Sequence, residues 1–174
     1  PGFFTDLVDA ASDLYERARE RLDQARAGKS LSRQRIPTGL HDVDVLLKGG
    51  LRKGTLNLIA GRPGQGKSSW MQTVALHALE LGKRVAFFSL EMPKDEVAAR
   101  LLSATSGLDA NLLSEGLLGD SDWQALILAL EGVQRERVFI SDTPSLTPAQ
   151  LRAQAYQLTA RYGIDLVMVD YLQL

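Results

Sequence analysis

From Ile36 onward the sequence alternates short apolar runs with longer stretches of helical periodicity, and this alternation constrains the fold more than any other feature. The apolar runs predict four strands, at 56–60, 85–90, 138–141 and 166–170. The stretches between them predict helices at about 68–81, 94–106, 121–135 and 148–162. Strands that alternate with helices of this length form βαβ units with right-handed crossovers. The predicted fold class is therefore α/β, with a mostly parallel sheet flanked by helices.

Capping residues support two of the helix boundaries. Ser121 with Gln124, and Thr147 with Gln150, both have the spacing of a capping box, in which each side chain bonds the other's backbone N–H. Pro148 then occupies the first helical position of the last helix, where its missing N–H costs nothing. These signals place the starts of the last two helices near 121 and 148.

The N-terminal 28 residues have the pattern of an amphipathic linker helix. Their apolar side chains recur at helical spacing in one stripe, formed by Phe4, Leu7, Val8, Ala11, Leu14, Tyr15, Ala18, Leu22 and Ala25. A polar stretch at 29–35 reads as a hinge, and the domain proper is expected over 36–174. From the pattern alone, the helix is equally able to fold back on its own core or to dock on another subunit.

Composition excludes several classes of function. The chain has no cysteine, which excludes disulfides, thiolate nucleophiles and Cys-ligated zinc, and it has only two histidines. Lys and Arg number 20 against 21 for Asp and Glu, so no global basic surface marks nucleic-acid binding, although a local one stays open. Neither a membrane span nor a signal peptide is evident, and we expect a soluble, cytoplasmic protein with no membrane partner.

One glycine-rich segment carries a specific chemical signal. Residues 61–68 satisfy the pattern G-x-x-x-x-G-K-[ST], directly after the first predicted strand and before a predicted helix. The glycines Gly61, Gly64 and Gly66 allow backbone angles that let amide N–H groups curl around an anion, and the helix N-terminus favours negative charge. Lys67 is expected to reach the β- and γ-phosphates and Ser68 to ligate Mg²⁺. The segment therefore predicts a nucleotide phosphate site, a P-loop.

Two acidic residues at predicted strand ends are candidates to complete this site. Ligands of open α/β sheets lie beyond the carboxyl ends of the strands, where Asp170 and Glu91 both lie. Asp170 is expected to organise Mg²⁺ through a water, and Glu91 to act as the general base; the alternatives are a turn-capping aspartate and an exposed helix-start acid. Asp142 also ends a strand and is interpreted as a turn residue. Gln173 either senses the γ-phosphate or is simply polar.

With these pieces placed, the chain resembles the C-terminal ATPase domain of bacterial DnaB-type replicative helicases, in the RecA-like superfamily of P-loop NTPases. The resemblance covers about 36–174 and is carried by the segments Ile36-Pro37-Thr38-Gly39-Leu40 with Asp44, Gly49-Gly50-Leu51, Gly61-Arg62-Pro63, Ser89-Leu90-Glu91-Met92, Arg100-Leu101-Leu102, Asp122-Trp123, Asp142-Thr143-Pro144 and Asp170-Tyr171-Leu172-Gln173-Leu174. The P-loop is shared by many folds. The segments at 89–92 and 170–174 are far more specific to the family.

The resemblance implies an ATP-hydrolysing motor subunit of a hexameric ring that translocates on single-stranded DNA and unwinds duplex, with ATP and Mg²⁺ as cofactors. It implies that Glu91 and Lys67 are catalytic and that Ser68 and Asp170 organise the metal. It assigns the nucleotide to a set of residues near the P-loop and two further positions: Gly61, Arg62, Pro63, Gly64, Gln65, Gly66, Lys67, Ser68, Ser69, Arg100 and Gln173. It also implies that the N-terminal helix docks on the neighbouring subunit, and that primase and a helicase loader are partners.

In the family the domain continues with more sheet, DNA-facing loops and an arginine finger, so we expect the chain to be a fragment of such a motor that is weakly active or inactive on its own. Two other readings stay open. One is a different RecA-like ATPase, such as a recombinase or clock-type protein, and the other is a nucleotide-binding scaffold associated with a helicase. The presence of Lys67, Glu91 and Asp170 together favours the motor. A small-molecule kinase would need an Arg-rich lid, which the sequence lacks.

Overall fold

A computed structural model of the chain describes residues 35–132 and 137–170 and, nearer the N-terminus, residues 12, 15, 16, 18–20 and 23. These N-terminal residues are helical and exposed. The rest of the predicted helix and most of the hinge at 29–35 lie outside the described residues. Among the described residues, no helix has both the length and the apolar character needed to cross a membrane.

Three parallel strands form the sheet, in the order β4-β3-β5. Their bounds are β3 Val85–Ser89, β4 Val138–Ser141 and β5 Leu166–Asp170. The central strand β3 pairs with β4 on one side and with β5 on the other, in a register that places Ser89 opposite Asp170. All five residues of β3 are buried. The predicted parallel α/β architecture is therefore confirmed, and the predicted strands at 85–90, 138–141 and 166–170 form within one residue of their expected bounds.

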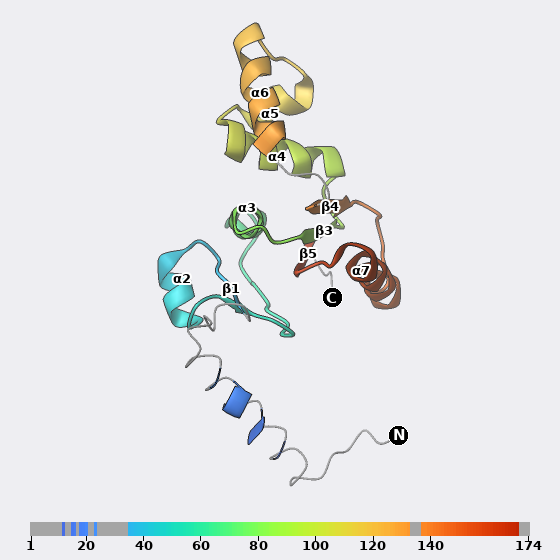
Figure 1. Cartoon of the computed structure of the whole chain (residues 1–174). Helices are drawn as coiled ribbons and strands as arrows, with labels where there is room; N and C mark the ends of the chain where they lie inside the picture. Colours follow the sequence, from blue (N-terminus) through green and yellow to red (C-terminus); the bar gives the residue numbers. More distant parts are fainter. Residues whose placement is uncertain are drawn as a thin grey trace.

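Helices cover both faces of this sheet (Figure 1). Helices α3 (Lys67–Glu80) and α4 (Lys94–Ser106) pack on one face, where they share a core with β3 built from Val74, Ala75, Ala78, Val85, Phe87, Val97 and Leu101. Helix α7 (Pro148–Tyr162) lies on the opposite face (Figure 1), with the Tyr162 ring 4.5 Å from that of Phe139 in β4. Helix α6 (Asp120–Gly132) packs on α4, farther from the sheet.

The segment 35–52 forms a small unit that the sequence did not predict. Strands β1 (Arg35–Ile36) and β2 (Leu51–Arg52) pair antiparallel, and the short helix α2 (His41–Leu46) lies between them. The Asp44 carboxylate accepts hydrogen bonds from the Thr38 amide at 2.7 Å and the Thr38 hydroxyl at 2.8 Å, and Thr38 is fully buried. A second short helix, α5 (Ala110–Glu115), was also not predicted.

The two predicted capping boxes have different outcomes. At α7 the box forms as expected: the Thr147 hydroxyl accepts from the Gln150 amide, and the Gln150 side chain accepts from the Thr147 amide at 3.0 Å. At α6 the predicted cap at Ser121 is wrong, because the helix already begins at Asp120. The Asp122 carboxylate instead accepts from the Gly119 amide at 2.9 Å, so an aspartate inside the first turn takes the capping role.

Candidate functional site

The predicted strand at 56–60 does not form, and this is the main correction to the sequence analysis. The segment joins β2 to the P-loop without regular structure, and Leu56 and Leu58 are 83% and 80% exposed. Within the described part of the chain the sheet consists of β4, β3 and β5, and β1 and β2 pair only with each other. A strand needs hydrogen-bonded neighbours, and the described residues give 56–60 none. The P-loop is therefore positioned by the helix that follows it rather than by a strand before it.

The P-loop itself has the backbone that its glycines predict. Gly64 and Gly66 have φ values of 77° and 82°, and Gly66 is the N-cap of α3 in the left-handed conformation. A Cβ built at either glycine meets no atom within 4 Å, so the space beside the loop is open. The sign of φ, and not crowding within the chain, is what favours glycine at these positions. No side chain among the described residues caps the N-terminus of α3, which leaves backbone N–H groups available to an anion.

Lys67 and Ser68 occupy the first turn of α3. The Lys67 ammonium donates to the Gly61 carbonyl at 3.1 Å, so the side chain folds back across the loop. Both residues are half-buried, whereas 61–66 are exposed. An ammonium that spans the mouth of a glycine-rich loop fits a polyphosphate, which offers that cation stronger acceptors than a carbonyl. The donor set is thus compatible with nucleotide phosphates.

The two candidate acids lie at the same edge of the sheet. Asp170 ends β5 and is 4% exposed, and its carbonyl accepts from the Leu90 amide at 2.7 Å. Glu91 follows Leu90 directly and its side chain is exposed. The structure therefore brings Glu91 and Asp170 to adjacent strand ends, as the parallel topology predicts. Mg²⁺ prefers a few oxygen ligands together with phosphates, and a hydroxyl with one carboxylate, as in Ser68 and Asp170, suits it.

Asp142 was predicted to be a turn residue, and in the structure it also bonds the start of a helix. Its carboxylate accepts from the Lys94 amide, the first residue of α4, at 3.1 Å. The N-cap of α4 is Pro93, whose side chain has no hydrogen-bonding group. Asp142 therefore caps a helix that begins three residues after Glu91. No local pattern signals this contact, because the partners are 48 residues apart.

The structure does not place two other predicted site residues, Arg100 and Gln173, at the nucleotide site. The Arg100 guanidinium donates to the Glu96 carboxylate at 2.6 Å, an i,i+4 pair on α4 in which both side chains are partly exposed. That pair is what a surface arginine on a helix makes. Gln173, the remaining member of the predicted nucleotide set, lies outside the described residues, with 171–174 as a whole.

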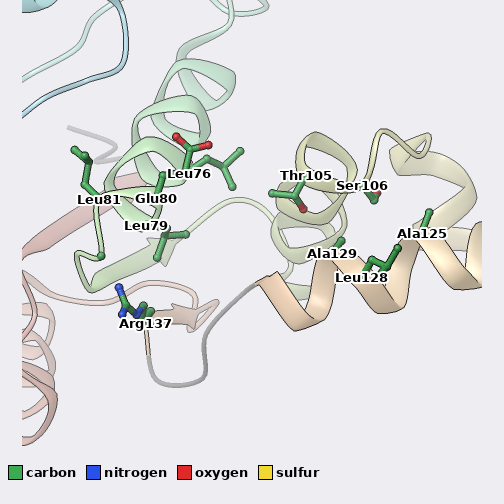
Figure 2. A pocket seen from close by; sticks show the side chains of 11 residues that line it. Leu76, Leu79, Glu80, Leu81, Thr105, Ser106, Ala125, Leu128, Ala129 and Arg137 are labelled. Carbon is green, nitrogen blue, oxygen red and sulfur yellow. The ribbon is translucent and has the colours of Figure 1, made fainter.

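An apolar cavity of about 810 Å³ lies away from these acids, between α3, α4 and α6. Figure 2 shows Leu76 and Leu79 of α3 on one side of it and Leu128 and Ala129 of α6 on the other. The Arg137 guanidinium borders it near the start of β4. Four large apolar side chains of α6 are also exposed: Trp123 at 50%, Ile127 at 52%, Leu128 at 68% and Leu130 at 50%. An apolar helix face of this kind is typical of a surface that contacts another element.

Comparison with known sequences gives one consistent result. Residues 35–174 match the family described as "DnaB-like helicase C terminal domain". The chain is 36% identical over 171 residues to the "Replicative DNA helicase DnaB" of Nostoc sp. (strain PCC 7120). That alignment covers 97% of this chain and 19% of the Nostoc protein. It is 32% identical over 173 residues to the protein of the same name from Leifsonia xyli subsp. xyli, with 98% and 38% covered. The chain thus spans about a fifth to two fifths of the length of these curated relatives.

Solved structures agree on the fold. An ATPase domain matches with a TM-score of 0.74 at 22% identity, over 97% of this chain and 58% of that one. A DnaB-like replicative helicase, described together with its interactions with primase, matches with a TM-score of 0.73 at 22% identity, over 97% and 39%. These neighbours confirm the RecA-like α/β fold predicted from the sequence. With a family match that covers four fifths of its length, the chain belongs to the DnaB-like helicase C-terminal domain family.

Proposed function

We propose that the chain supplies the ATP-binding and ATP-hydrolysing core of a replicative DNA helicase subunit. The observation that carries this proposal is the convergence of Glu91 and Asp170 at adjacent strand ends in a chain with a complete P-loop. Replicative helicases drive DNA unwinding with ATP hydrolysis, and the family match supports assigning that activity to the protein of which this domain forms part. A cytoplasmic location belongs to the same proposal.

Each residue of the site has a distinct role in this proposal. The backbone N–H groups of the loop 61–66, where Pro63 has none, and the N-terminus of α3 bind the phosphates, and Lys67 neutralises charge that develops on the β- and γ-phosphoryl groups. Ser68 and Asp170 hold Mg²⁺, which supplies Lewis-acid stabilisation of that charge when it is bound. Glu91 accepts a proton from the attacking water. Ser69 and Gln173 complete the proposed nucleotide contacts, and Arg100 joins them when its surface pair with Glu96 opens.

A titration with a fluorescent ATP analogue in the presence of Mg²⁺ tests the binding half of this proposal. Lys67→Ala is expected to weaken binding by about tenfold or more, because it removes a charged hydrogen-bond donor to phosphate. Lys53→Ala is the matched control, since Lys53 is an exposed lysine outside the loop. Equal binding by the wild type and Lys67→Ala would contradict the P-loop assignment.

Hydrolysis separates a motor from a nucleotide-binding scaffold. Glu91→Gln keeps the shape of the side chain but removes its basicity, so it is expected to leave nucleotide affinity unchanged and to lower turnover to a residual rate, by about 10²- to 10⁴-fold. A scaffold would be indifferent to that change. Single-turnover release of phosphate from Mg–ATP is the measurement, made beside the affinity of the same sample.

The proposal extends to assembly as a hexameric ring on single-stranded DNA, with primase and a loader as partners of the whole protein. Tyr15 belongs to the predicted apolar stripe of the N-terminal helix and is 63% exposed, so its own chain does not cover it. We assign the exposed apolar face of α6, with the cavity beside it, to the N-terminal helix of the neighbouring copy. Tyr15→Asp and Leu128→Asp are each expected to lower the mass measured by light scattering, and Gln157→Asp, at an exposed position of α7 on the opposite face of the sheet, is not.

A further inference from the structure

We infer that Ser89 and Asp142 are positioning residues for Glu91, which they hold at the sheet edge through the backbone on its two sides. The inference rests on the proposed function, in which Glu91 is the catalytic base. Glu91 lies in a connection of four residues between β3, which ends at Ser89, and α4, which begins at Lys94. Hydrogen bonds from the carboxyl ends of β3 and β5 reach this connection, and one from the end of β4 reaches the first residue of α4 that follows it.

Ser89 fixes the connection at its near end, where β3 ends. Its side chain is 1% exposed, and its hydroxyl donates to the Met92 carbonyl at 2.7 Å and accepts from the Met92 amide at 3.2 Å. Both bonds close a turn around Leu90 and Glu91. The Leu90 amide in turn donates to the Asp170 carbonyl at 2.7 Å, so the turn is tied to the end of β5.

Asp142 fixes the connection from its far end. Its carboxylate oxygen Oδ2 accepts from the Lys94 amide at 3.1 Å, and so ties the first residue of α4 to the end of β4. A negative charge at a helix N-terminus also interacts favourably with the helix dipole. Because the N-cap Pro93 has no side-chain acceptor, the cap comes from a different strand. Asp142 therefore sets where α4 starts relative to the sheet, and with it the far end of the turn that carries Glu91.

These hydrogen bonds matter for how precisely Glu91 is positioned, not for whether the domain folds. The Glu91 side chain is exposed, so its position depends strongly on the backbone beneath it. A catalytic group must be held within about 0.5 Å of its productive position. A misplacement of about 1 Å costs up to about 100-fold in rate. The bonds from Ser89, Asp170 and Asp142 are the means by which this fold supplies that precision.

Asp142→Ala tests the inference in the assembled full-length protein of which this domain forms part. We expect it to slow single-turnover hydrolysis of Mg–ATP by about 10- to 100-fold, with nucleotide affinity within about twofold of the wild type. Asp142→Asn keeps an oxygen acceptor and is expected to restore a large part of the rate. The matched control is Asp109→Ala, which removes another aspartate helix cap, at α5, where the carboxylate accepts from Asn111 and Leu112. It is expected to leave the rate unchanged.

Two results would overturn the inference. The first is that Asp109→Ala slows hydrolysis as much as Asp142→Ala does, which would show a general loss of stability. The second comes from a double-mutant cycle: if Asp142 acts through Glu91, Asp142→Ala has no further effect on turnover once Glu91→Gln is present. An equal slowing in both backgrounds would show that Asp142 acts elsewhere.

A measurement without nucleotide separates this inference from the proposed function. In the free chain, Asp142→Ala is expected to raise hydrogen exchange at the Leu90 and Met92 amides by at least about tenfold, and Asp109→Ala is not. If Glu91→Gln does not change hydrolysis, the proposed function fails, while this exchange experiment still decides whether Asp142 holds the turn. Unchanged exchange at both amides would overturn the inference on its own.

Discussion

Two apolar segments of five residues lead into the proposed site, and they have opposite environments. All five residues of β3 are buried, and β3 leads to Glu91. All five residues of 56–60 are exposed, and they lead to the P-loop. Their sequences, Val-Ala-Phe-Phe-Ser and Leu-Asn-Leu-Ile-Ala, both predict a strand. Apolar composition therefore does not decide which of them becomes one.

What separates the two segments is the presence of neighbours. β3 bonds β4 and β5 along both edges, and helices cover both of its faces. Within the described residues, no strand lies beside 56–60. Leu56 and Leu58 therefore stay exposed to water. Full burial of one such leucine is worth about 1.5–3 kcal/mol, which makes this segment a place where a further strand would bind favourably.

Hydrogen exchange is expected to show the largest difference between the two segments. Amides in β3 open only when the domain unfolds, whereas those of 56–60 are without strand partners in the described structure. For a domain with an unfolding free energy of about 5–15 kcal/mol, exchange at 56–60 should be faster by about 10³-fold or more. Residue-resolved exchange by NMR is the measurement. Similar protection in both segments would mean that 56–60 pairs in solution.

Phe87→Ala is expected to have the largest effect on stability. Phe87 is 1% exposed at the centre of β3, and removal of a buried phenyl ring leaves a cavity that costs about 3–5 kcal/mol. Urea unfolding followed by circular dichroism measures the change. A loss below about 1 kcal/mol would show that the core around β3 is far looser than its burial indicates.

Asp44→Ala tests the small unit that directly precedes 56–60. Its carboxylate bonds both the amide and the hydroxyl of Thr38, which is fully buried, and loss of a partner to a buried polar group costs about 1–3 kcal/mol. Asp42→Ala is the control, because Asp42 is an exposed acid on the same helix. Equal urea midpoints for the two variants would show that the 35–52 unit adds nothing to stability.

Leu58→Ser is expected to have the smallest effect. The side chain is 80% exposed, and substitutions at such positions stay within about 0.5 kcal/mol. The same unfolding experiment measures it beside Phe87→Ala. Destabilisation by more than about 1.5 kcal/mol, a typical cost for a buried leucine, would place Leu58 in a core and remove the contrast with β3.

The sequence predicted well what depends on nearby residues. The Thr147 capping box and the start of α7 both form as expected, because their contacts lie within a few positions. Two of the P-loop glycines, Gly64 and Gly66, adopt positive φ for the same reason. The convergence of Glu91 and Asp170 could also be predicted, since parallel strands place their carboxyl ends together.

The sequence predictions that were wrong or missing concern contacts between residues far apart in the chain, or short elements. No local pattern could show that 56–60 lacks a neighbouring strand, or that Asp142 reaches Lys94. Helices α2 and α5 have six residues each, too few for a periodic pattern to stand out. For α5 a signal was present in Asp109, whose carboxylate caps the helix, but a single capping residue also fits an ordinary turn.

The order of strands in the sheet has a consequence for synthesis. Arg84, just before β3, bonds Asp165, just before β5, across 81 residues of sequence. The ribosome adds about 5–20 residues per second, so β3 emerges about 4 to 16 seconds before its second partner exists. Throughout that interval a continuous apolar run, including Phe87 and Phe88, has an open edge. The central strand is thus the segment of the nascent chain with the greatest need for a chaperone, and the contacts with the longest sequence separation set when that need ends.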